Sequence, residues 1–214
     1  MTQGMSLEAS SAALAALGAF HGLNPGMGWL FAVALGLQER RRRAVWRALL
    51  PLGVGHALAV VAAVAIAVTI GIAIPLRHLQ WAVALLLIGM GIARLIRHRH
   101  PRWAQMRVNM RGLTLWSFLM ASAHGAGLMV VPLFLGMAVQ AEAACHATGG
   151  IVNTPAVALT ATAIHAVAYL AVTAVIAIVV YEKLGLALLR KAWINLDLIW
   201  AAALVATGAL TLAM

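Results

Sequence analysis

Long apolar runs separated by short polar links dominate this chain. Six runs reach about 18 residues or more, the length that a helix needs to cross the hydrocarbon core of a bilayer. They predict membrane-spanning helices at residues 11–37, 48–74, 79–96, 113–138, 156–180 and 192–214. The fold class predicted is therefore an all-α integral membrane protein with a short outer segment, residues 1–10, before the first helix.

The first apolar run is interrupted near its middle. The segment 21–28 contains a histidine, an asparagine, a proline and three glycines. Proline removes a backbone donor and clashes with the preceding turn, and glycine weakens a helix further. In hydrocarbon the freed backbone groups must be bonded by protein or must line a wet cavity. We therefore expect Asn24, Pro25 and Gly26 to break the helix and to line a substrate pathway, with a simple proline kink as the alternative.

Composition supports the membrane class and argues against other classes. Of the 214 residues, 64% are hydrophobic and 9% are charged, and the mean hydropathy is +0.98. A formal charge of +10 could indicate a nucleic-acid partner, but the arginines lie between the apolar runs. We therefore expect contact with lipid headgroups and no nucleic acid. The chain lacks HExxH, GxSxG and phosphate-loop motifs, so transport is expected instead of catalysis.

Charge also predicts the orientation. Of the 15 Lys and Arg residues, 14 lie in three links, at 40–47, 94–111 and 183–191. With six helices these links share one face of the membrane. The positive-inside rule makes that face cytoplasmic and places both termini outside, in an inner membrane of bacterial type.

The two halves of the chain repeat an order of short motifs. Ala-Phe-His-Gly at 19–22 corresponds to Ser-Ala-His-Gly at 122–125, and a proline follows each, at Pro25 and Pro132. The next helix of each half carries a histidine followed by alanine. This order predicts an inverted repeat of three helices plus three, with the first and fourth helices interrupted near mid-membrane.

The predicted boundaries follow from that repeat. Residues 11–98 form the first three-helix unit and residues 113–214 form the second. The basic segment 99–112 joins them on the cytoplasmic side. Small residues at Gly89, Gly91 and 201–206 would allow close helix contact and a homodimer.

Four histidines are predicted to share one level of the membrane, roughly 12 to 15 Å deep at 1.5 Å per residue. They are His21, His56, His124 and His165. Imidazole is the commonest nitrogen ligand of transition metals, and the neutral ring costs less to bury than a fixed charge. The favoured function is a permease that moves a divalent transition-metal ion through these rings.

Three other interpretations of the histidines stay open. The rings could relay protons in an exporter of a small organic solute such as an amino acid, with the segment 24–28 holding the solute. They could be axial ligands of a b-type haem. Each ring could also simply bond the backbone of a neighbouring helix.

Further residues are candidates for the pathway or its hinges. Pro25 and Pro132 are the expected hinges. Gly125 directly follows His124, and Tyr169 lies one turn after His165 on the same predicted helix. Asp197 is the one carboxylate within a predicted span. It could accept a proton or a cation from the cytoplasmic side, or pair with Lys191.

These features resemble the LysE-type superfamily of small six-helix transporters, which groups amino-acid exporters, CcdA-like carriers and nickel/cobalt permeases. The resemblance rests on length, the inverted pattern and Asn24-Pro25-Gly26 at the helix break. The nickel/cobalt members carry histidines early in their first helix, as His21 does here. The resemblance therefore implies a membrane transporter. No aspartate follows His21, however, and no membrane cysteine pair of the CcdA-like type is present.

Overall fold

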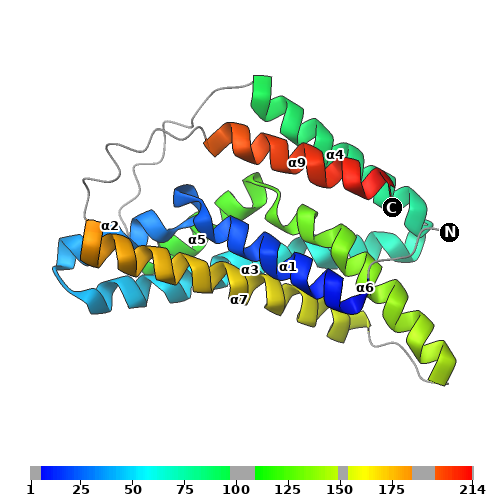
Figure 1. Ribbon diagram of the computed structural model, residues 1–214, viewed down its shortest axis with the longest axis horizontal. Helices are drawn as coiled ribbons and strands as arrows, with labels where there is room; N and C mark the ends of the chain where they lie inside the picture. The colour runs from blue at the N-terminus through cyan, green and yellow to red at the C-terminus, as the bar shows by residue number, and fades with distance from the viewer. Residues whose placement is uncertain (1–5, 97–108, 149–153, 185–195, 214) are drawn as a thin grey trace.

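The computed structural model describes residues 6–96, 109–148, 154–184 and 196–213, which form an elongated bundle of helices (Figure 1). The order along the chain is α1 (Leu7–Leu23), the 3-10 turn η1 (Pro25–Met27), α2 (Trp29–Glu39), α3 (Arg42–Ala73), α4 (Leu76–Ile96), α5 (Met110–Ala123), α6 (Ala126–Thr148), α7 (Thr154–Val179), the short π-helix η2 (Val180–Leu184) and α9 (Leu196–Ala213).

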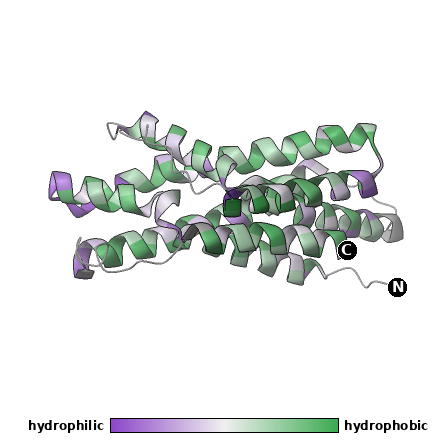
Figure 2. Cartoon of the chain, turned by 90° about the horizontal axis from the view of Figure 1, so that it is seen from above, coloured by the Kyte–Doolittle hydropathy of each residue, from purple (hydrophilic) through white to green (hydrophobic). Residues whose placement is uncertain are grey.

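The described residues are all-helical, and helix length and surface chemistry are consistent with a helical membrane protein. Within the described ranges, α3, α4, α6 and α7 are each long and apolar enough to cross a membrane. On α3 the outward positions Leu50, Leu58 and Ile66 are exposed apolar side chains. Hydrophobic colour follows the helices, and hydrophilic colour gathers mainly at their ends (Figure 2). Such a surface is suited to hydrocarbon and unsuited to water.

The interruption of the first predicted helix lies where the sequence places it, because α1, η1 and α2 follow one another across Asn24–Gly28. The second interruption is displaced from the predicted hinge. It lies at His124 and Gly125, between α5 and α6, whereas Pro132 lies inside α6. The expectation of a break at Pro132 is therefore wrong. Gly125 has φ +72° and turns the backbone, whereas α6 continues through Pro132.

Two predicted segments fall largely or partly outside the described residues. These are the basic linker at 99–112, of which residues 109–112 are described, and the start of the last helix at 192. The part of that helix that the structure describes is α9, from Leu196.

Glycines set the closest helix contacts. α1 packs along α7, α3 along α5, and α4 along α9. A Cβ atom at Gly18 or Gly22 of α1 would collide with a carbonyl oxygen of α7, that of His165 or of Tyr169. Gly55 of α3 lies in the same way against the backbone of α5. These contacts bring backbones together as small residues do in membrane bundles.

The pair α4–α9 forms a layer of its own beside the other helices (Figure 1). An added Cβ at Gly91 would come within 2.9 Å of the Ala201 carbonyl oxygen, and one at Gly208 within 2.8 Å of the Ala84 carbonyl oxygen. Gly91 and Ala201, which the sequence suggested for a homodimer, therefore meet within one chain. The homodimer stays a prediction, with Gly89 open for such a contact.

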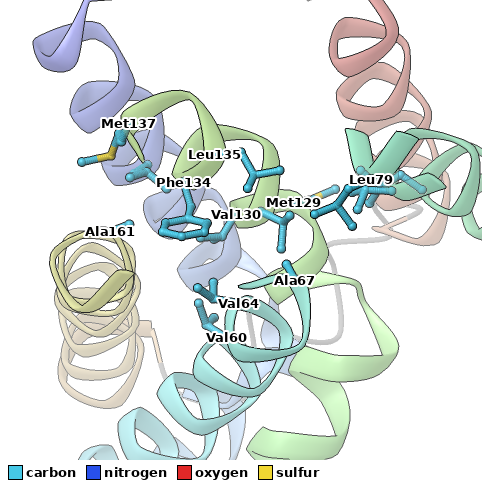
Figure 3. Close-up of a cluster of buried hydrophobic side chains, with 14 of the residues drawn as sticks. Val60, Val64, Ala67, Leu79, Met129, Val130, Phe134, Leu135, Met137 and Ala161 are labelled. Atoms are coloured by element: carbon cyan, nitrogen blue, oxygen red, sulfur yellow. The ribbon is translucent and has the colours of Figure 1, made fainter. Parts of the chain in front are cut away.

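Two apolar clusters lie on either side of the central histidines. One contains Val60, Val64, Met129 and Phe134 and connects α1, α3, α4, α6, α7 and α9 (Figure 3). The other connects α2, the first half of α3 and the end of α7, and includes Leu52. Because Leu52 and Val60 flank His56 on α3, the histidine level lies between two dry regions.

Two of the basic links lie at one end of the bundle, and the start of α1 and the end of α9 lie at the other (Figure 1). Arg42, the first residue of α3, forms an ion pair with Glu182 of η2, with Nε and Oε1 2.9 Å apart. Two of the three basic links are thus at one end of the molecule. α1 begins and α9 ends at the other end (Figure 1).

Candidate functional site

Three of the four predicted histidines meet in the middle of the bundle. His21 lies near the end of α1, His56 in α3 and His165 in α7, and each is fully buried. Their ring centroids are 5.1 Å apart for His21 and His165, 5.7 Å for His21 and His56, and 5.3 Å for His56 and His165. The close approach of Gly18 to the His165 backbone draws α1 and α7 together at this level.

His56 and His165 share a hydrogen bond. Their Nε2 atoms are 3.1 Å apart, and the ring planes differ by 12°. Since a nitrogen that accepts must lack a proton, one ring donates its N–H and the other accepts with its lone pair. The pair therefore holds one proton between two rings that come from different halves of the chain.

Tyr169 supports this histidine pair from the side. Its ring stacks on His56, with centroids 3.8 Å apart and planes at 10°. Its hydroxyl donates to the Met27 carbonyl, with the two oxygens 2.7 Å apart. Tyr169 therefore fixes the orientation of His56 and ties α7 to the break after α1.

His21 is held as one tautomer by its own helix. Its Nδ1 lies 2.7 Å from the Leu17 carbonyl oxygen, and a carbonyl can only accept, so Nδ1 carries the proton. The neutral ring then has its lone pair on Nε2, the arrangement that second-shell bonds give to metal-binding histidines. His124 repeats the pattern, with Nδ1 2.8 Å from the Met120 carbonyl oxygen.

Three ring nitrogens of the cluster are unused. Within the described residues, His21 Nε2, His56 Nδ1 and His165 Nδ1 are buried and have no hydrogen-bond partner. Buried polar atoms in native proteins are nearly always bonded, so unbonded nitrogens on three neighbouring rings indicate a place for a ligand or a proton.

One aromatic ring contacts both His124 and His21 of the cluster. The indole of Trp200, in α9, contacts His21 with centroids 4.8 Å apart and His124 with centroids 5.3 Å apart. Both contacts are edge-on, and Trp200 also packs on Phe20 at 4.6 Å. Nothing in the sequence marked Trp200 among the seven tryptophans, because its role depends on how α9 packs.

The first helix break is internally bonded. The Asn24 side chain accepts from the Gly26 amide at 2.8 Å and caps the 3-10 turn that begins at Pro25. Three aromatic side chains donate to the freed carbonyls: Trp29 Nε1 to Leu23 at 3.0 Å, Trp116 Nε1 to Gly26 at 3.2 Å, and Tyr169 Oη to Met27 at 2.7 Å. These carbonyls already have partners, which weighs against a direct role for them in holding a substrate.

The second break is held from outside. Gly125 takes a positive φ, and the Ala123 carbonyl accepts from Nη2 of Arg94, in α4, at 2.7 Å in an exposed position. Of the other predicted pathway residues, Pro132 lies within α6, two turns beyond Gly125. Asp197 lies in the first turn of α9, and its side chain is outside the described residues.

A ready-made metal centre is not visible in the described ranges, because no group of three or more His, Cys, Asp or Glu side chains there is positioned to hold an ion. The three rings are close, but the two Nε2 atoms of His56 and His165 bond each other. Any ion would first have to displace the proton between them.

Comparison with known proteins finds no match: no family model, no curated protein and no solved structure is similar to this chain. The interpretation of the site therefore depends on its own geometry and chemistry.

Proposed function

We propose that this protein is a membrane permease that moves a divalent transition-metal ion, with His21, His56 and His165 as the central stop on the ion's path. The observation that carries the proposal is the cluster itself. Three buried imidazoles from three helices lie with centroids 5.1 to 5.7 Å apart. Ionisable side chains inside a membrane bundle are costly and usually mark such paths.

The chemistry of the donors supports a metal cargo. Two nitrogen ligands at 2.0 to 2.1 Å from a tetrahedral ion are roughly 3.3 Å apart. The Nε2 atoms of His56 and His165 are 3.1 Å apart, close to that separation. His21 offers a third lone pair on Nε2. Metal uptake would release the proton shared by His56 and His165, since a coordinating nitrogen must be unprotonated.

We expect such a site to bind the metal ion weakly. The three ligands are neutral, so they do not compensate the charge of a divalent ion in a low dielectric. The ion would therefore leave readily. This behaviour favours passage over storage.

We place this site at the centre of a six-helix inverted repeat, with α1–α2, α3 and α4 related to α5–α6, α7 and α9. Exchanging the halves converts the α1–α7 contact into the α3–α5 contact and leaves α4 against α9. His21 and His124 each lie at a helix break and each bond the carbonyl four residues earlier. The charge pattern supports a cytoplasmic basic face, termini outside and a bacterial-type inner membrane.

The test is uptake of Ni²⁺, Co²⁺ or Zn²⁺, each alone, into vesicles that contain the purified protein. We expect at least one ion to enter, and His21→Gln, His56→Gln and His165→Gln each to reduce that uptake roughly tenfold or more. His78→Gln is the matched control, because His78 is exposed at the start of α4. No uptake above empty vesicles for all three ions, or equal uptake by all variants, would overturn the proposal.

Proton transfer is a second candidate, favoured by the N–H···N bond between His56 and His165. A proton passed along this pair could drive export of a small organic solute. The same vesicles, loaded with a pH-sensitive dye and given a pH gradient without metal, distinguish the two functions. Proton flux that His165→Gln abolishes, without metal uptake in any sample, would replace the metal proposal.

The remaining interpretation is less well supported. A b-type haem lies between its two axial rings, whereas His56 and His165 bond each other directly. The absorption spectrum of the purified protein tests haem independently, through the presence or absence of a Soret band.

A further inference from the structure

Trp200 occupies a position that connects the two halves of the histidine set. Its indole is 2% exposed and has edge-on contacts to both His21 and His124. Phe20 packs on a third part of the ring. One bulky aromatic side chain thus packs against both His124 and the cluster.

The helix that carries Trp200 belongs to the α4–α9 layer. α9 makes most of its contacts with α4, through Gly91 and Gly208, and few with the rest of the bundle. The other helices pack among themselves through the glycines of α1 and α3. A shift of the α4–α9 pair would slide Leu87 and Leu204 over the apolar cluster of α3 and α6 and would leave in place the glycine contacts that hold His21, His56 and His165.

The same pair also holds the second helix break. Arg94 of α4 donates to the Ala123 carbonyl, directly before His124. Trp200 thus contacts the His124 ring, and Arg94 bonds the carbonyl of the residue directly before it. A shift of the pair would withdraw the indole from His124 and release the Ala123 carbonyl together.

We propose that Trp200 is the gate of the pathway: its indole closes the connection between His124 and the cluster of His21, His56 and His165, and movement of the α4–α9 pair opens it. This inference rests on the permease function proposed above. It assigns His124 to one stop of the cargo and the three-histidine cluster to the next. The cargo passes from one to the other only when the indole has moved.

The gate predicts faster passage when the indole is removed. Two edge-on aromatic contacts hold Trp200 in place, and their loss is expected to raise metal uptake by Trp200→Ala roughly tenfold. Trp200→Phe keeps a smaller ring and should give an intermediate rate. Trp81→Ala is the matched control, since Trp81 is an exposed tryptophan on the same helix pair, in α4. Uptake by this control should equal that of the unaltered protein.

A second measurement tests the gate without relying on metal transport. Cys145 is the one cysteine of the chain, so Cys145→Ser with His165→Cys leaves a single thiol inside the cluster. Its rate of reaction with a membrane-impermeant methanethiosulfonate reagent reports access to the cluster. We expect that rate to rise roughly tenfold when Trp200→Ala or Trp200→Phe is added. Trp81→Ala should leave it unchanged.

The outcomes separate the gate from the function. An unchanged labelling rate in both Trp200 variants would overturn the gate, whatever the uptake assay gives. Faster labelling with no metal uptake in any variant would support the gate and overturn metal passage. If Trp200→Ala does not yield monodisperse protein, Trp200→Phe and Trp200→Leu provide the same comparison.

Discussion

The two helix breaks begin with the same His-Gly pair and are held in different ways. The first, after His21, is buried and is bonded by neutral groups: the Asn24 side chain and three aromatic donors from α2, α5 and α7. The second, at His124, has backbone bonds to Met120 and Ser122, a glycine with positive φ, and one side-chain donor from another helix, Arg94 of α4. The first break is therefore part of the core. The second is coupled to the helix pair that carries Trp200.

We infer from this difference that the two breaks have different structural roles. A break whose backbone groups are all bonded within the bundle is a fixed support for His21. The second break has one side-chain donor from another helix, and its own backbone bonds remain when that donor is lost, so it can be released with less loss. The two breaks thus occupy related positions in the sequence repeat but differ in how easily they can move.

The sharpest test compares the two glycines. Gly28 has φ +141°, and a Cβ there would lie 2.7 Å from Cδ2 of Leu52, so Gly28→Ala should lower the free energy of unfolding by about 3 kcal/mol. Gly125 has φ +72°, a left-handed conformation, and Gly125→Ala should cost about 1 kcal/mol. Unfolding in mixed detergent and denaturing surfactant, followed by circular dichroism, measures both. A larger loss at Gly125 would reverse the assignment of the fixed and the releasable break.

The next effect concerns the bonded carbonyls of the first break. Tyr169→Phe keeps the ring that stacks on His56 and removes the hydroxyl that donates to Met27, which leaves that buried carbonyl without its partner. We expect a loss of about 2 kcal/mol in the free energy of unfolding. Tyr181→Phe is the control, because Tyr181 is only half-buried near the end of the bundle. Equal stability of the two variants would show that the Met27 carbonyl does not need this donor.

The smallest effect is expected at the second break. Arg94→Gln removes the guanidinium that bonds the Ala123 carbonyl, but the backbone bonds of the break, from His124 N to Met120 O and from Gly125 N to Ser122 O, remain. The free energy of unfolding should fall by less than about 1 kcal/mol. The same surfactant titration, with Arg77→Gln as the surface control on α4, measures it. A loss as large as that of Tyr169→Phe would remove the contrast between the breaks.

The sequence was sufficient for features that depend on local chemistry. Asn24, Pro25 and Gly26 lie close together in sequence and end a helix wherever they occur, so the first break could be located. A rise of 1.5 Å per residue also placed the histidines at one level, and the structure brings three of them into contact.

Features that depend on tertiary packing could not be predicted in this way. Pro132 has a stronger local signal than Gly125, yet the chain breaks at Gly125, where α5 and α6 change direction. The donors to the first break are equally remote: Trp116 and Tyr169 lie 90 and 142 residues from the carbonyls they bond. Trp200 became visible only through the packing of α9.

The glycines of α1 have a consequence for the response of the protein to its lipid. Gly18 and Gly22 place α1 backbone against α7 backbone, so the distance between the backbones that carry His21 and His165 is set by atoms that cannot change rotamer. In a thinner or thicker bilayer the two helices would tilt together as one unit. The spacing of these imidazoles should therefore be insensitive to acyl chain length, while the α4–α9 pair, which lacks such a link to the bundle, absorbs the mismatch.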